Sequence, residues 1–104
     1  MIRMGFKMKL NPGQKNEYQS RHNKIWPELK NLLKDSGISD YVIFLDEETN
    51  ILFASMKLND PSIFNNLSDH PIMKKWWAYM KDIMETNPDN SPASKPLIEM
   101  FYLE

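Results

Sequence analysis

His22 is the residue in this sequence whose chemistry and position best suit acid/base catalysis. Unperturbed imidazole titrates near neutral pH, so His22 could accept and donate a proton within one reaction cycle without a metal. It belongs to a set of residues spaced at three- and four-residue steps, which share one inward face of a predicted helix: Tyr18, His22, Ile25, Leu29 and Leu32. The alternative is a core histidine that is satisfied by a hydrogen bond.

Four aromatic residues could surround a ligand at His22. Tyr18 lies one helical turn away, about 6 Å, so the two side chains could touch one small molecule. Tyr41 opens a predicted strand, where its phenol could hydrogen-bond a ligand hydroxyl. Trp76 and Trp77 offer flat surfaces that suit stacking on a sugar, although adjacent helical residues diverge by about 100°. The alternatives are core packing for Tyr18 and core or hairpin packing for Tyr41. For the two tryptophans, the alternative is that one packs on the sheet and the other against a second chain.

The segment 87–92, with the sequence NPDNSP, combines fixed backbone torsions with short polar groups. Such a segment is typical of a turn and equally of a loop that binds hydroxyls. With His22 and the aromatic residues, it makes a cofactor-free, carbohydrate-sized acid/base site the leading hypothesis.

Composition excludes several other kinds of chemistry. The 104 residues contain no cysteine, which removes disulfides, thiolate metal sites and thiol nucleophiles. Only two histidines are present, without a nearby carboxylate cluster, so we expect no metal. The 13 basic and 14 acidic residues are interleaved, which argues against nucleic acid and an anionic membrane as partners. The charges within the apolar N-terminal run argue against a signal peptide or membrane span, so we expect a cytoplasmic protein.

The order of the predicted elements indicates a single domain, residues 1–104, of the ferredoxin-like α+β class. Residues 2–10 alternate as a strand, and Asn11 could cap a helix that ends at Gly37 and is kinked or restarted at Pro27. Segments 41–46 and 51–58 form a hairpin across residues 47–50. A short helical turn at residue 60, a helix over 71–86 and a strand over 97–103 follow.

In such a fold both main helices cover one face of an antiparallel sheet. The other face is left open, and the second, third and fourth predicted strands are apolar on both alternations. We therefore predict that a second copy of the chain covers this face, giving a homodimer.

Three motifs in the same order carry a resemblance to a known family. They are Glu17-Tyr18-Gln19 to Arg21-His22-Asn23 followed by Ile25-Trp26-Pro27-Glu28-Leu29, then Trp76-Trp77-Ala78-Tyr79-Met80, then Asn87-Pro88-Asp89-Asn90-Ser91-Pro92. The whole chain resembles the L-rhamnose mutarotases. That resemblance implies a dimeric α+β barrel that interconverts the α and β anomers of L-rhamnose without a cofactor. It further implies that His22 is the proton donor and that Tyr18, Tyr41, Trp76 and Trp77 bind the sugar.

Two other functions remain open on the residues themselves. A cofactor-independent oxygenase could use the same dimeric α+β-barrel fold, since one fold hosts several chemistries. A non-catalytic sugar-binding module could contain His22 as a satisfied core residue. The oxygenase would consume oxygen, whereas the binding module would hold a sugar without accelerating anomer exchange.

Overall fold

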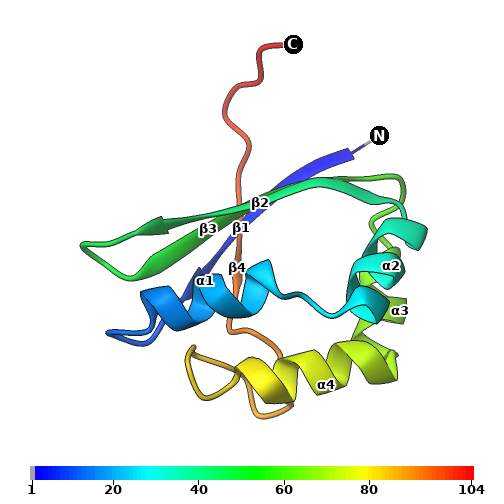
Figure 1. Cartoon of the computed structure of the whole chain (residues 1–104). Helices are drawn as coiled ribbons and strands as arrows, with labels where there is room; N and C mark the ends of the chain where they lie inside the picture. Colours follow the sequence, from blue (N-terminus) through cyan, green and yellow to red (C-terminus); the bar gives the residue numbers. More distant parts are fainter. Residues whose placement is uncertain (1) are drawn as a thin grey trace.

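The computed structural model describes residues 2–104 and consists of an antiparallel sheet with its helices on one face (Figure 1). The elements in chain order are β1 (Ile2–Lys9), α1 (Lys15–Asn23), α2 (Pro27–Asp35), β2 (Ile38–Asp46), β3 (Ile51–Leu58), α3 (Ile63–Asp69), α4 (Pro71–Met80) and β4 (Lys95–Leu97). The strands lie in the order β2-β3-β1-β4, and every neighbouring pair is antiparallel. The predicted ferredoxin-like α+β fold is therefore confirmed.

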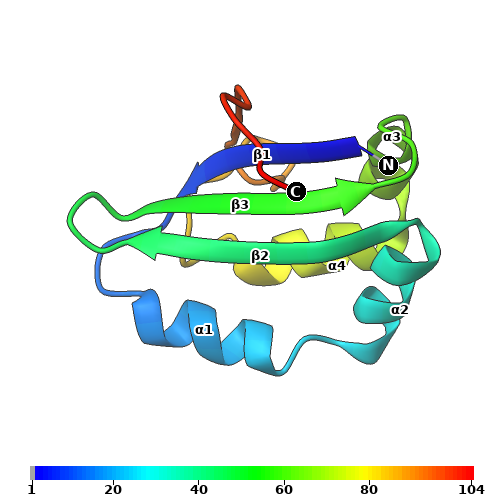
Figure 2. The same cartoon turned by 90° about the horizontal axis from the view of Figure 1, so that it is seen from above.

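The two faces of the sheet differ in burial because successive side chains of a strand point to opposite sides. In β3 four alternate residues are buried under the helices: Leu52, Ala54, Met56 and Leu58. Phe53 points to the open face, where it lies in register with Phe44 of β2 and Lys7 of β1. Figure 2 looks onto this open face, with α1, α2 and α4 beyond the strands. The core of the molecule thus lies on the helical side alone.

Pro27 breaks the first predicted helix into two. Trp26 has an extended backbone, and Pro27 is the first residue of α2, where its missing N–H costs nothing. The expectation of a restart at Pro27 is confirmed, but the expectation of an Asn11 cap is wrong. Helix α1 begins later, after Gln14, and the Asn11 side chain instead donates to the carbonyl oxygen of Asp82 at 3.4 Å.

The last two predicted elements are shorter than the sequence indicated. Helix α4 ends at Met80 because the following residues pair with the end of β1: Glu85 N–H donates to the Lys9 carbonyl and Asn11 N–H to the Ile83 carbonyl. The predicted strand over residues 97–103 is wrong except at its start. Strand β4 pairs with β1 only from Lys95 to Leu97, and the tail beyond it leaves the sheet (Figure 1).

Candidate functional site

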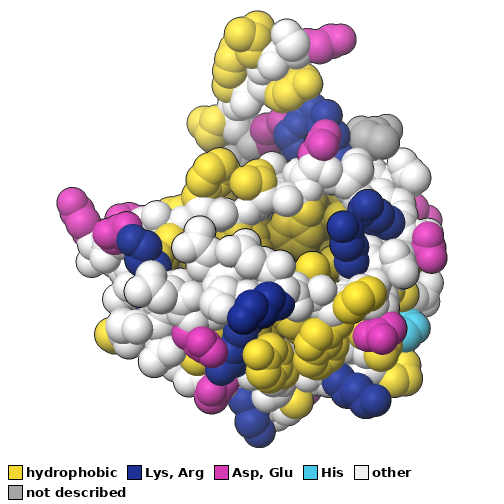
Figure 3. All heavy atoms as spheres, viewed as in Figure 1, with side chains coloured by type: hydrophobic (Ala, Val, Ile, Leu, Met, Phe, Trp, Pro, Cys, Tyr) yellow, Lys and Arg dark blue, Asp and Glu magenta, His cyan; other side chains and the backbone are white. Residues whose placement is uncertain are grey.

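A cavity of about 900 Å³ lies between the sheet and helices α1, α2 and α4. All five residues that the sequence singled out line it: Tyr18, His22, Tyr41, Trp76 and Trp77. In Figure 3 hydrophobic side chains are visible inside a hollow on this side of the molecule. Because the five residues come from α1, β2 and α4, only the folded chain brings them together.

The imidazole of His22 lies between two aromatic rings. Tyr18 stacks on it with a centroid distance of 4.2 Å and an interplanar angle of 28°, and Trp76 meets it edge to face at 5.4 Å. Its Nδ1 atom is 3.0 Å from the backbone carbonyl oxygen of Tyr18. Burial lowers the pKa of His22, and the hydrogen bond to this carbonyl partly opposes the effect. The ring is therefore held in one orientation and is neutral at pH 7.

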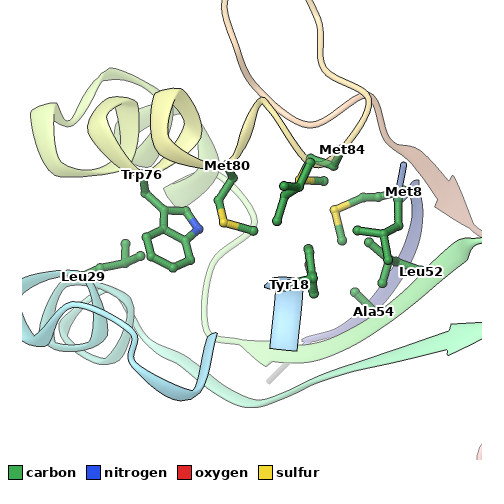
Figure 4. Packing of buried hydrophobic residues seen from close by; sticks show 10 residues of the cluster. Met8, Tyr18, Leu29, Leu52, Ala54, Trp76, Met80 and Met84 are labelled. Atoms are coloured by element: carbon green, nitrogen blue, oxygen red, sulfur yellow. The ribbon is translucent and has the colours of Figure 1, made fainter. Parts of the chain in front are cut away.

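Trp76 is the largest buried side chain of the site, with 7% of its surface exposed. Figure 4 shows its indole nitrogen directed toward the space beside Tyr18 and Met80. Trp26, which the sequence offered only as part of a motif, contacts Trp76 edge to face at 5.1 Å and stacks on Tyr79 at 5.6 Å. Trp26 therefore supports the wall of the site. The sequence did not indicate this role, because Trp26 lies between α1 and α2 rather than on a helical face.

Tyr41 reaches the cavity because β2 contains a bulge. Ser39 lies opposite Lys57 and Val42 opposite Ser55, so Asp40 and Tyr41 together face the single residue Met56 of β3. The extra residue of the bulge is accommodated at Asp40, whose backbone has a φ of 48°. The bulge turns Tyr41 to the helical side, where its ring lies 6.3 Å from that of Phe6.

Both phenols of the cavity resist ionisation. Burial raises the pKa of Tyr41 to about 12, although 39% of the surface of the residue is exposed. Burial raises the pKa of Tyr18 further, and the nearby Tyr41 phenol adds to that shift. Across the neutral range the site therefore presents two protonated phenols and one neutral imidazole.

The remaining lining residues divide into an apolar floor and a polar rim. Methionines are prominent on the floor: Met8, Met56, Met73, Met80 and Met84. On the rim Lys15 and Glu47 form an ion pair at 2.6 Å, and the 87–94 loop contributes Asn87, Asn90 and Ser91. An apolar floor with a few polar groups suits a small amphipathic ligand. Within residues 2–104 no three histidine, aspartate or glutamate side chains gather closely enough to hold a metal ion.

Hydrogen bonds of the Arg21 side chain link α1 to the end of α4. Its guanidinium donates to both carboxylate oxygens of Asp82, at 2.9 and 3.2 Å, and to the Tyr79 carbonyl at 2.7 Å. That carbonyl belongs to the last turn of α4, where backbone acceptors lack partners in the helix. The side chain of Arg21 is only 11% exposed, and it holds its neighbour His22 against the helix that carries Trp76.

We expect Arg21→Met to lower the free energy of unfolding by about 1–2 kcal/mol, because it removes charge-assisted hydrogen bonds that are only partly screened by solvent. Methionine keeps much of the apolar stem, so packing changes little. Urea denaturation of this variant and of Lys30→Met, a matched change at an exposed position of α2, measures the difference. Equal stability of the two variants would contradict a fastening role for Arg21.

The fold and the site define a ferredoxin-like α+β protein with a histidine in an aromatic-walled cavity. The profile of the L-rhamnose mutarotase family matches residues 3–103. The chain belongs to the L-rhamnose mutarotase family. It is 58% identical to an L-rhamnose mutarotase of Formosa agariphila over the whole of both chains, and 56% identical to one of Flavobacterium johnsoniae over 99% of this chain and 96% of the relative.

Solved structures agree with this assignment. The crystal structure of an L-rhamnose mutarotase from Formosa agariphila superposes with a TM-score of 0.93, at 57% identity and full coverage of both chains. A putative antibiotic biosynthesis monooxygenase from Chloroflexus aurantiacus matches with a TM-score of 0.59 at 12% identity, covering 99% of this chain and 98% of its own. The second likeness concerns the fold alone.

Proposed function

We propose that this chain interconverts the α and β anomers of L-rhamnopyranose and that His22 carries the acid/base step. The observation that carries the proposal is the placement of the His22 imidazole in the cavity between Tyr18 and Trp76. Family membership supports the substrate, because the relatives named above are L-rhamnose mutarotases. We assign sugar binding to Tyr18, Tyr41, Trp76 and Trp77.

The cavity has the groups that such a reaction needs. Ring opening removes a proton from the anomeric hydroxyl and delivers one to the ring oxygen, which requires a base and an acid but no cofactor. The indole faces and the methionine floor provide apolar surface for the C–H side and the methyl group of a 6-deoxy sugar. The phenols and the polar rim provide donors and acceptors for the hydroxyls.

The activity can be tested by NMR saturation transfer between the α and β anomeric protons of L-rhamnose. We expect the protein to accelerate exchange well above the rate in buffer. It should affect D-glucose much less, because D-glucose has a hydroxyl at C6 and the opposite configuration at several ring carbons. Exchange of L-rhamnose at the buffer rate would contradict the proposed function. It would favour a module that only binds sugar.

We also propose that the protein works as a cytoplasmic homodimer of single-domain chains. Support comes from apolar side chains that lie on the open face of the sheet and on the tail beyond β4. The largest exposed fractions are those of Phe44 at 64%, Ile98 at 85%, Met100 at 88%, Phe101 at 79% and Leu103 at 80%. The tail projects from the sheet in Figure 3, where a second chain could cover it. No helix within residues 2–104 is long and apolar enough to cross a membrane.

We expect Phe53→Glu to convert the dimer to a monomer at micromolar concentration, because it places a charge on the face that the second copy would cover. Within one chain the change is tolerable, since the new carboxylate would face Lys7 across the β1–β3 pair. Analytical ultracentrifugation of this variant and of wild type measures the mass. A monomeric wild-type protein would contradict the dimer, and a dimeric variant would exclude this face as its interface.

A further inference from the structure

Helix α1 carries Tyr18 and His22, but its own sequence holds it in place only weakly. It has nine residues; among residues 2–104 no side chain caps its start, and Tyr18 is its only buried residue. Helices this short are marginal in water, so their stability depends on packing. Yet the Cα atoms of α1 lie more than 8 Å from those of every other helix and strand in the described chain. Side-chain contacts must therefore hold α1 in position.

Two polar contacts tie α1 to the rest of the molecule, one toward each end of the helix. Toward the C-terminal end, Arg21 binds Asp82 and the Tyr79 carbonyl. At the N-terminal end, the Lys15 ammonium donates to the Glu47 carboxylate of the β2–β3 hairpin at 2.6 Å. The Arg21 side chain is 11% exposed, whereas those of Lys15 and Glu47 are 56% and 69% exposed. Because solvent weakens exposed ion pairs, the Lys15 end of α1 is the more easily released.

The Lys15–Glu47 pair lies at the rim of the cavity. Both residues line the cavity, as do Tyr18 and His22 of α1 and several residues of β2. The pair joins the start of α1 to the hairpin that follows β2, at one end of the molecule (Figure 2). Just before α1, Gly13 has a φ of 78°, and no atom of a non-neighbouring described residue lies within 4 Å of the place where its side chain would begin. The start of α1 therefore has room to move.

We propose that Lys15 and Glu47 are positioning residues, which hold α1 closed against the sheet and so keep Tyr18 and His22 at the sugar. The proposal rests on the mutarotase activity proposed above. When the pair opens, the start of α1 moves away from the hairpin and the rim of the cavity widens. The closed arrangement is the one that binds the sugar, so the apparent dissociation constant rises as the closed fraction falls. Lys15 and Glu47 act through α1 and take no part in the proton transfers.

Reversal of one charge tests the pair. Lys15→Glu sets two carboxylates against each other and should weaken L-rhamnose binding about 3- to 10-fold, with kcat at saturation near that of wild type. The swapped variant Lys15→Glu/Glu47→Lys should restore the affinity. Lys30→Glu makes the same charge change at an exposed position of α2 outside the cavity and should match wild type. Titration calorimetry and saturation-transfer NMR measure both quantities. Wild-type affinity in Lys15→Glu, or no recovery in the swapped variant, would overturn the proposal.

Hydrogen exchange of backbone amides tests the hold on α1 without any sugar. Amides of α1 should exchange faster than those of α2, and Lys15→Glu should speed exchange in α1 alone by about 3- to 10-fold. A rise in NaCl from about 0.02 to 0.5 M should also speed it in wild type, because salt screens an exposed pair, but not in Lys15→Gln/Glu47→Gln. Exchange in α1 that responds to neither charge nor salt would overturn the proposal. Failure of the wild-type protein to accelerate interconversion of the L-rhamnose anomers would instead overturn the proposed function, while the amide exchange of α1 would still report on the pair.

Discussion

Replacement of His22 by Gln should lower kcat for anomer exchange by about 10²- to 10⁴-fold, the usual contribution of a positioned acid/base group. Glutamine is neutral, polar and similar in length to histidine. It should therefore keep most of the packing that His22 makes with the Tyr18 ring and the edge of Trp76. Sugar binding should survive because the rest of the cavity wall is unchanged. Saturation-transfer NMR for turnover and titration calorimetry for L-rhamnose affinity measure the two effects separately.

The chain offers a matched control in its second histidine. His70 lies at the N-terminus of α4, where its Nδ1 accepts a hydrogen bond from the Ile72 backbone at 3.2 Å. Asparagine is a good acceptor at that position, so His70→Asn should preserve both fold and turnover. Full turnover in His22→Gln would remove His22 from the mechanism. Equal losses in both variants would indicate a general effect of substitution rather than catalysis by His22.

Replacement of Trp76 by Ala should lower the free energy of unfolding by about 3–5 kcal/mol and weaken L-rhamnose binding at the same time. The indole is almost fully buried and contacts His22, Trp26 and Tyr79, so its removal leaves a cavity that these rings cannot fill. From the sequence alone a loss of binding would be the main expectation. The expected loss of stability follows from the burial of Trp76 in the structure.

Trp77 separates the two effects. It also lines the cavity, but it is only partly buried and packs at the margin of the core. Trp77→Ala should therefore cost about 1–2 kcal/mol of stability while still weakening binding. Urea denaturation and KM for both variants test the distinction. Equal destabilisation by the two substitutions would contradict the structural role assigned to Trp76.

The sequence by itself determined the elements whose cause is local. The alternation in residues 2–10 and the polar 47–50 turn identified β1 and the hairpin, because strand period and turn chemistry act within a few residues. Pro27 divided the first helix for the same kind of reason, since its ring fixes φ and it lacks an N–H. Helical spacing likewise placed Tyr18 and His22 on one face, and in the structure their rings stack.

The tertiary structure decided whatever depended on a distant partner. The sequence predicted a helix over residues 71–86, but backbone hydrogen bonds of Ile83 and Glu85 with the end of β1 and the residues that follow it ended α4 at Met80. The run 97–103 is apolar on both alternations, as a covered strand would be, yet a strand forms only where another supplies hydrogen bonds, and among the described residues that pairing stops at Leu97. Tyr41 faces the cavity through a bulge that depends on pairing with β3. Side-chain periodicity can be read from the sequence of one segment, whereas strand register, bulges and cavities arise only when separate segments pack together.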